Sequence, residues 1–258
     1  MKLKSVCILL FSIVAFIGTI NAQSRDFYQF KIYSIDNAQQ EQRIDQYLEN
    51  AYLPALKRAG IPSVGVFKPI EGDANQGKMI FVMVPFMSLE QFETLPAQLN
   101  NDKKYQQDGQ DYIEAPHDNS PYARIESIIL RAFKDIPEFH IPDHSTPRAE
   151  QIYELRSYHS ATEKIYEKKV DMFNQGGENK IFFELGFQPV FFGEVISGSS
   201  MPNLMYMITF ENAESQAAHW KAFSSHPDWE VLKNLEKYKN TVSHIDKYLL
   251  HPTAYSGI

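Results

Sequence analysis

The sequence YELRSY at residues 153–158 alternates apolar and polar side chains, and it opens a segment that repeats an earlier part of the chain. Its first four residues align with FKIY at 30–33, and the apolar run at 203–210 aligns with the run at 79–86. The copies are separated by 123 to 126 positions. Solenoid repeats are shorter and need more copies, so this long period predicts a duplicated domain.

Each copy is predicted to fold as a βαββαβ unit. In the first copy, apolar residues alternate with polar ones over 27–35, which indicates a strand, and then recur every three or four positions, which indicates a helix. The same order follows in the second copy. We therefore expect an α+β fold with two tandem ferredoxin-like units at 27–134 and 151–256, joined by a linker at 135–150. Each sheet has one face without helices, and the other copy can cover it.

Two prolines fall within predicted helices of the first copy. Pro54 is expected to kink the first helix or to restart it at Leu53. Ser88 is a candidate N-cap, with Gln91 three residues later, so a second helix should begin near Leu89. We expect Pro96 to interrupt that helix.

The first 22 residues resemble a signal peptide. Lys2 and Lys4 precede an almost wholly apolar stretch at 6–20, which is shorter than the roughly 20 residues of a membrane-spanning helix. We expect cleavage after residue 22 and export to the periplasm or the exterior, rather than retention as a membrane anchor. Because Cys7 is the only cysteine, the mature chain would contain no disulfide, thiolate zinc site or iron–sulfur cluster.

Charge argues against two classes of partner. The formal charge is −7, and loss of the two signal-segment lysines makes it −9. We therefore expect neither nucleic acid nor an anionic membrane as the main partner. The sequence leaves open whether copies of this chain associate into larger oligomers. The aromatic share of 13% suggests large side chains inside a sheet or around a pocket.

The second copy resembles the NIPSNAP family. The resemblance rests on YELRSY at 153–158, LGF at 185–187, the helix around Trp220 and HPDW at 226–229. It is weaker in the first copy. NIPSNAP domains belong to the dimeric α/β-barrel group, so the resemblance implies a pseudo-dimeric barrel formed within one chain. Related barrels include cofactor-independent monooxygenases and haem-handling enzymes, but fold does not fix function.

Strand alternation supplies the candidate site residues. It places Glu154, Arg156 and Tyr158 on one strand face and the apolar Tyr153 and Leu155 on the other. We expect the apolar set to pack against helices and the polar set to face the barrel interior. The matching residues of the first copy, which should join the polar set, are Lys31 and Tyr33.

We assign proton transfer to Glu154 and to His159, which follows the strand, and ligand binding to Arg156, Tyr158, Lys31 and Tyr33. The alternative is a structural ion-pair network between the sheets.

Other chemistries have little support in the sequence. There is no HxH or HExxH motif, and Pro142 between His140 and His144 argues against a helical metal pair. His219 and His244 are the candidate axial ligands if the protein binds haem, but the sequence has no motif for covalent haem attachment. We expect no metal and no cofactor.

Two functional hypotheses follow. The first is an exported protein that binds a small, partly apolar molecule in the barrel, with cofactor-independent oxidation or isomerisation as its reaction. The second is a non-enzymatic interaction module whose barrel is filled by side chains.

Overall fold

The computed structural model describes residues 24–258, so the predicted signal segment at 1–22 lies outside the described residues. The first half contains β1 (Phe27–Ser34), α1 (Ala38–Tyr47), the π-helical turn η1 (Leu48–Tyr52), α2 (Leu53–Arg58), β2 (Gly65–Pro69), β3 (Met79–Phe86), α3 (Leu89–Asn101), α4 (Lys103–Asp108), α5 (Gln110–Ile113) and β4 (Arg124–Ala132).

The second half repeats this order. It contains β5 (Ile152–His159), α6 (Glu163–Phe173), α7 (Glu178–Glu184), β6 (Gln188–Ser197), β7 (Asn203–Phe210), α8 (Ala213–Ser224), α9 (Pro227–Asn234), the 3-10 turn η2 (Glu236–Tyr238) and β8 (His244–Pro252).

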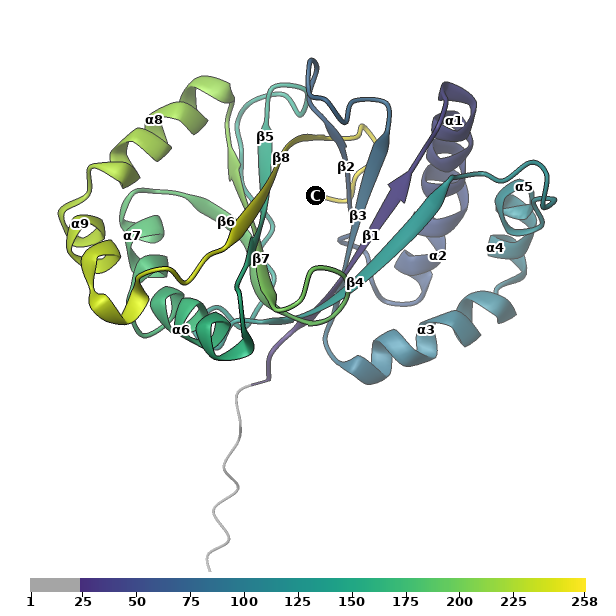
Figure 1. The fold of residues 1–258 in the computed structure, drawn as a ribbon. Coiled ribbons are helices and arrows are strands. Elements are labelled where there is room, and N and C mark those ends of the chain that lie inside the picture. Colours follow the sequence, from purple (N-terminus) through teal and green to yellow (C-terminus); the bar gives the residue numbers. More distant parts are fainter. Residues whose placement is uncertain (1–23) are drawn as a thin grey trace, which may run out of the picture.

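The eight strands close into an antiparallel barrel with the order β1-β3-β2-β8-β5-β7-β6-β4. Each half contributes a ferredoxin-like sheet, and the pairs β2–β8 and β4–β6 join the two sheets. Figure 1 shows the helices of the two halves on opposite outer sides of the strands. The predicted fold, with two units that form one barrel within a chain, is confirmed.

Three hydrophobic clusters fill the molecule. One lies inside the barrel and draws side chains from both halves, including Phe30, Phe81, Leu155, Phe191 and Met207. The other two lie between each sheet and its own helices. The barrel interior is therefore a packed core.

The expected strand facing is wrong. Tyr153 and Leu155 belong to the interior cluster, whereas Tyr158 belongs to the cluster beneath the second half's helices. The physical reason is solvation. The interior is enclosed by both sheets and takes the apolar set, while the helix-covered face has a cavity where the charged group of Arg156 keeps part of its exposure.

The prolines have different effects. The helix after β1 changes to π-helical hydrogen bonding at Leu48 and returns to α-helix at Leu53, so the predicted restart before Pro54 is confirmed. Ser88 caps α3 by accepting a hydrogen bond from the Gln91 N–H, as expected. However, α3 runs unbroken through Pro96 to Asn101, and the predicted interruption is wrong.

The linker packs closely on the barrel. Thr146 and Ser145 donate hydrogen bonds to the carboxylate of Glu211, just after β7, and the Phe139 N–H donates to Asp26. Over residues 24–258, no helix has both the length and the apolar character needed to cross a membrane.

Candidate functional site

The carboxylate of Glu154 is the centre of a polar network between β5 and α8. Its side chain is fully buried. It accepts hydrogen bonds from Arg156 Nε at 2.6 Å, from Gln216 Nε2 at 2.7 Å and from Trp220 Nε1 at 2.7 Å. Three donors, one of them charged, compensate for the lost hydration of this buried anion.

Arg156 links Glu154 to an aromatic wall. Its guanidinium lies 3.7 Å from the centroid of the Trp220 ring, and Nη1 donates to the Tyr158 hydroxyl at 3.1 Å. Burial alone would lower the pKa of Arg156, but Tyr206, Tyr158 and Glu154 together raise it above its ordinary value. The side chain therefore stays cationic and is held in one orientation.

A second ion pair lies deeper beneath the helices. Lys169 of α6 and Glu178 of α7 are both buried, with 2.7 Å between Nζ and Oε2. Lys169 also lies 4.5 Å from the centroid of the Phe173 ring. Burial raises the pKa of Glu178, although the nearby Lys169 opposes this shift. Glu178 is thus a carboxylate that accepts a proton more readily than an exposed glutamate.

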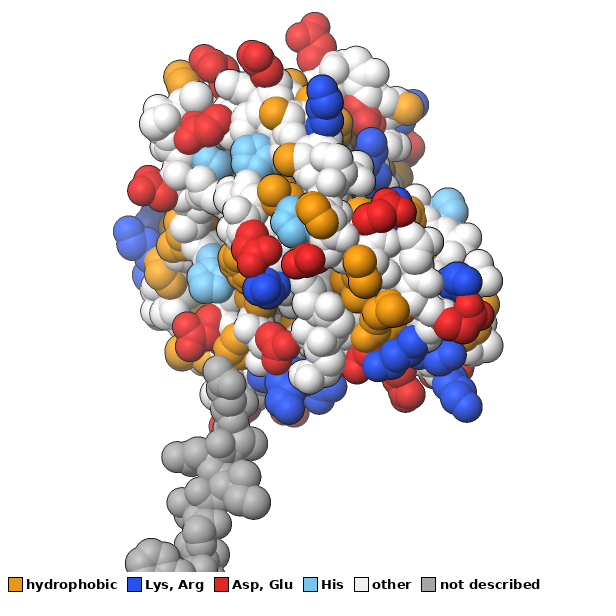
Figure 2. All heavy atoms as spheres, turned by 90° about the vertical axis from the view of Figure 1, so that its left-hand side faces the viewer, with side chains coloured by type: hydrophobic (Ala, Val, Ile, Leu, Met, Phe, Trp, Pro, Cys, Tyr) orange, Lys and Arg blue, Asp and Glu red, His pale blue; other side chains and the backbone are white. Residues whose placement is uncertain are grey.

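Arg156 and the pair formed by Lys169 and Glu178 border a cavity of about 440 Å³ between the outer face of the sheet and α8 and α9. Figure 2 faces the side of the molecule that carries the second half's helices, where hydrophobic side chains reach the surface among Asp and Glu residues. The lining combines charged, phenolic and aromatic groups: Arg156, Tyr158, Lys169, Glu178, Trp220, Phe223, Ser224, Trp229, Val242 and Ile245.

His159 lies apart from this cavity. Its Nε2 is 3.0 Å from Asp246 and 3.1 Å from the Ser157 hydroxyl. His159 and Ser157 lie on the same face of β5 as Leu155. The ring of His244 is 5.1 Å away, centroid to centroid. The two residues predicted to transfer protons, Glu154 and His159, therefore lie on opposite faces of β5.

Lys31 and Tyr33 face the helices of the first half. Tyr33 is fully buried and accepts a hydrogen bond from the Tyr112 hydroxyl at 3.2 Å. Lys31 borders a cavity of about 320 Å³ beneath α3. The six predicted residues thus divide into three groups, with Glu154, Arg156 and Tyr158 together.

Lys169 and Glu178 were missed by the sequence reasoning. Glu178 begins α7, a helix that the sequence patterns did not indicate. Lys169 did leave a signal. It falls on the apolar stripe of α6 with Tyr166 and Phe173, where a charge needs a buried partner.

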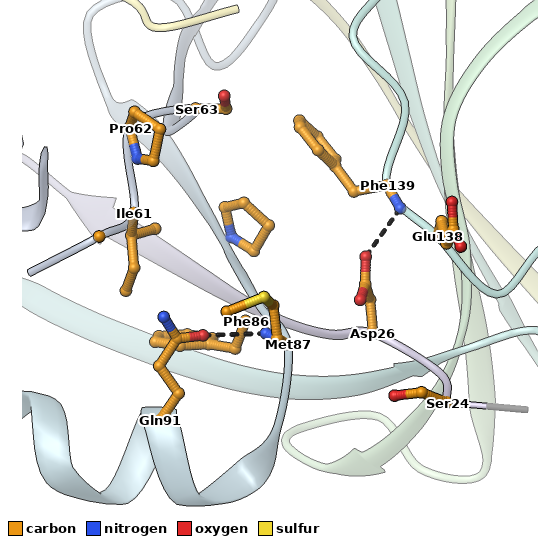
Figure 3. A pocket seen from close by; sticks show the side chains of 12 residues that line it. Ser24, Asp26, Ile61, Pro62, Ser63, Phe86, Met87, Gln91, Glu138 and Phe139 are labelled. Atoms are coloured by element: carbon orange, nitrogen blue, oxygen red, sulfur yellow. Dashed lines mark hydrogen bonds between the residues drawn. The ribbon is translucent and has the colours of Figure 1, made fainter.

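Another cavity, of about 470 Å³, lies where the turn after α2 meets the linker (Figure 3). Two of its polar side chains, Asp26 and Gln91, already have structural partners. Asp26 accepts a hydrogen bond from the Phe139 N–H, and Gln91 accepts one from the Met87 N–H ahead of α3 (Figure 3). For this reason we place the candidate site in the second half.

Metal binding finds no support in the described part of the chain. Residues 24–258 contain no group of three or more His, Cys, Asp or Glu side chains placed to hold a metal ion. His144 instead forms a 2.7 Å hydrogen bond with the Thr209 hydroxyl, and His219 Nδ1 lies 2.7 Å from the carbonyl of Ser215.

Comparison with solved structures supports the barrel. A candidate monooxygenase from Lactobacillus acidophilus NCFM superposes with a TM-score of 0.57 at 11% identity, covering 88% of this chain and 94% of that chain. An anthrone oxidase-like protein gives 0.53 at 8% identity, covering 90% and 93%. At these identities the likeness is one of fold.

Further comparisons concern a shorter protein and the family model. A NIPSNAP-like domain protein from Burkholderia xenovorans aligns at 15% identity with a TM-score of 0.38, covering 42% of this chain and 89% of that chain. The comparison with curated proteins gave no match. The NIPSNAP family model matches residues 153–257. The second half of this chain is therefore a NIPSNAP domain.

Proposed function

We propose that the second half binds a small, largely aromatic molecule with a carbonyl or hydroxyl oxygen in the 440 Å³ cavity beneath α8. The observation that carries this proposal is the composition of the cavity wall. Trp220, Phe223 and Trp229 offer ring surfaces, while Arg156 and Tyr158 offer polar atoms. Apolar walls with a few polar groups are typical of small-molecule sites.

The charges favour a neutral ligand over an anion. Arg156 is paired with Glu154, and Lys169 is paired with Glu178. A guanidinium has five N–H groups, and the contacts with Glu154 and Tyr158 leave N–H capacity for a ligand oxygen. We assign ligand orientation to Arg156 and Tyr158, and the positioning of Arg156 to Glu154.

Glu178 is the group that we assign to proton transfer. A buried carboxylate with a raised pKa is suited to remove a proton from carbon next to a carbonyl, leaving an enolate on the ligand. Return of that proton at another carbon completes an isomerisation. In the oxidation, O₂ adds to the deprotonated carbon and takes up the proton to give a hydroperoxide, and loss of water, with the second hydrogen of that carbon, leaves a new carbonyl group. The names of the candidate monooxygenase and the anthrone oxidase-like protein favour the oxidation.

Tryptophan fluorescence tests the binding step directly. The chain has two tryptophans, and both line this cavity, so an aromatic ligand should quench most of the emission. We expect anthrone or 2-naphthol to quench saturably in wild type and at least tenfold more weakly in Arg156→Ala. Arg156→Lys is the companion variant if Arg156→Ala misfolds, and Lys31→Met, in the other half, is the matched control. Unchanged titration of folded Arg156→Ala would refute the site.

Native mass spectrometry of the purified protein tests the same proposal without a chosen ligand. It reports in one measurement whether a small molecule is retained and how many subunits associate.

The Glu178→Gln variant tests the assigned base. It should still retain the molecule but should no longer convert it, because the amide does not accept the proton. Full turnover by Glu178→Gln would exclude the assigned base.

An interaction module is the second candidate function. The packed barrel interior favours it, as do Val231 on α9 and Leu235 just after this helix, which are 65% and 44% exposed and border a cavity of about 290 Å³. Exposed apolar side chains of this kind occur at protein contacts. A Val231→Asp/Leu235→Asp variant should then elute later from a sizing column than wild type. Identical elution would count against self-association through α9.

Export is part of the proposal and rests on the signal-like sequence at 1–22. Sequencing the amino terminus of protein recovered outside the cytoplasm should give Gln23 as the first residue. Recovery of the intact chain from the cytoplasm would contradict it.

A further inference from the structure

The first half has its own cavity at the position that corresponds to the candidate site. Tyr105 and Trp229, as well as Leu99 and Phe223, are separated by the repeat distance of 124 positions, and each member borders the cavity of its own half. The first-half cavity measures about 320 Å³. Its lining consists of Gln29, Lys31, Tyr52, Phe92, Leu95, Pro96, Leu99, Asn100 and Tyr105.

The charge in this cavity differs from that in its counterpart. Lys31 occupies the repeat position of Glu154, which in the second half has an arginine, an amide and an indole as donors. The Lys31 ammonium lies 4.6 Å from the centroid of the Tyr52 ring. Among residues 24–258, no carboxylate lies within 4.0 Å of it.

Two other polar side chains of this lining, Tyr105 and Gln29, have hydrogen-bond partners. The hydroxyls of Tyr105 and Tyr47 are hydrogen-bonded to each other at 2.8 Å, and Gln29 donates to Ser127 at 2.8 Å. Burial lowers the pKa of Lys31, and the surrounding tyrosines only partly oppose the shift. A half-buried ammonium with one aromatic contact is poorly compensated, and an anion would stabilise its charged form.

We propose that the first half binds a small monocarboxylate, with the carboxylate paired to Lys31 and the apolar body against Phe92, Leu95 and Leu99. The single cation selects one negative charge. The three apolar side chains, which come from α3, select an aliphatic or aromatic body. This cavity lies at the low end of ligand-site volumes, so the ligand is small. The proposal is independent of the function assigned to the second half.

Octanoate and phenylacetate are suitable probes, with octanamide and phenylacetamide as neutral counterparts of almost the same shape. Binding is measured by isothermal titration calorimetry and ligand-observed NMR, because both tryptophans lie in the other half. We expect wild type to bind at least one carboxylate tenfold or more tightly than its amide. Lys31→Met, which keeps the length of the side chain without its charge, should remove this preference.

Two further variants make the result decisive. Lys31→Arg keeps the charge and should retain carboxylate binding, while Leu99→Trp fills the cavity and should abolish binding with Lys31 still present. Arg156→Ala, in the other half, should bind the carboxylate as wild type does. Equal affinity for carboxylate and amide, or unchanged binding by folded Lys31→Met, would overturn the proposal. Loss of binding in Arg156→Ala alone would overturn it too, by placing the carboxylate in the second half.

Discussion

The indole nitrogen of Trp220 donates a hydrogen bond to the buried carboxylate of Glu154, with 2.7 Å between the two atoms. The face of the same indole lies against the guanidinium of Arg156. One side chain of α8 therefore stabilises both members of an ion pair on β5, and it joins the helix to the sheet at the edge of the candidate site.

Replacing Trp220 by Phe should lower the free energy of unfolding by about 2 kcal/mol, because a buried carboxylate loses one of its donors. Trp229→Phe is the matched control, since no hydrogen bond joins the Trp229 indole to residues 24–258. Trp229→Phe should lower the free energy of unfolding by less than about 1 kcal/mol. Urea unfolding followed by circular dichroism measures both, and equal losses would show that the hydrogen bond contributes nothing.

The buried pair Lys169 and Glu178 should be more sensitive to loss of one partner than to loss of both. Lys169→Met leaves a carboxylate without its cation and should cost about 3 to 5 kcal/mol of stability. Lys169→Met/Glu178→Leu removes both charges and should recover most of that loss. A double-mutant cycle from urea unfolding gives the coupling, and additive losses would contradict a coupled pair.

Glu211 should make the linker contact sensitive to acid. Hydrogen bonds from the Thr146 hydroxyl and from the Ser145 and Thr146 N–H groups lower the pKa of Glu211 to about 2, from an ordinary value of 4.5. Because the folded pKa is the lower one, this stabilisation is complete above about pH 4.5 and is lost as the pH falls toward 2. The stability difference between wild type and Glu211→Gln should therefore be constant from pH 6 to 8 and shrink below pH 4.5. A difference that grows on acidification would reverse the assignment.

Gly193 should be sensitive to added volume, because it lies where β6 pairs with β4. A Cβ at this position would lie 3.1 Å from Leu130 Cβ and 3.4 Å from the Arg131 carbonyl oxygen. Gly193→Val should destabilise the protein by about 1 to 3 kcal/mol, and Gly193→Ala by less. Thermal unfolding of both variants checks this order. An increase in stability with side-chain size would mean that the junction between the halves is loosely packed.

The fold was predictable because the duplication is long and both periodicities are clear. The pattern over 153–158 indicated a strand, and the apolar spacing indicated helices, so the order of elements followed. The predicted interruption at Pro96 was wrong because a proline only removes one hydrogen bond and crowds one turn of a helix. In α3 the packing of Leu95 and Leu99 outweighs that cost.

The candidate site was harder to predict. Alternation showed that Glu154, Arg156 and Tyr158 share a face, and the structure brings these three side chains together. Periodicity alone does not say which face is the interior, because both faces of this sheet are buried. Glu178 and Trp220 approach Arg156 through tertiary folding of α7 and α8, which the strand sequence does not encode.

Covalent joining of the two halves has a genetic consequence. In a symmetric homodimer every substitution appears twice, so a change that suits one cavity is imposed on the other. Here β2–β8 and β4–β6 complete the barrel within one chain, and each substitution appears once. A lysine at position 31 can therefore coexist with a glutamate at position 154, and selection can act on the two cavities separately.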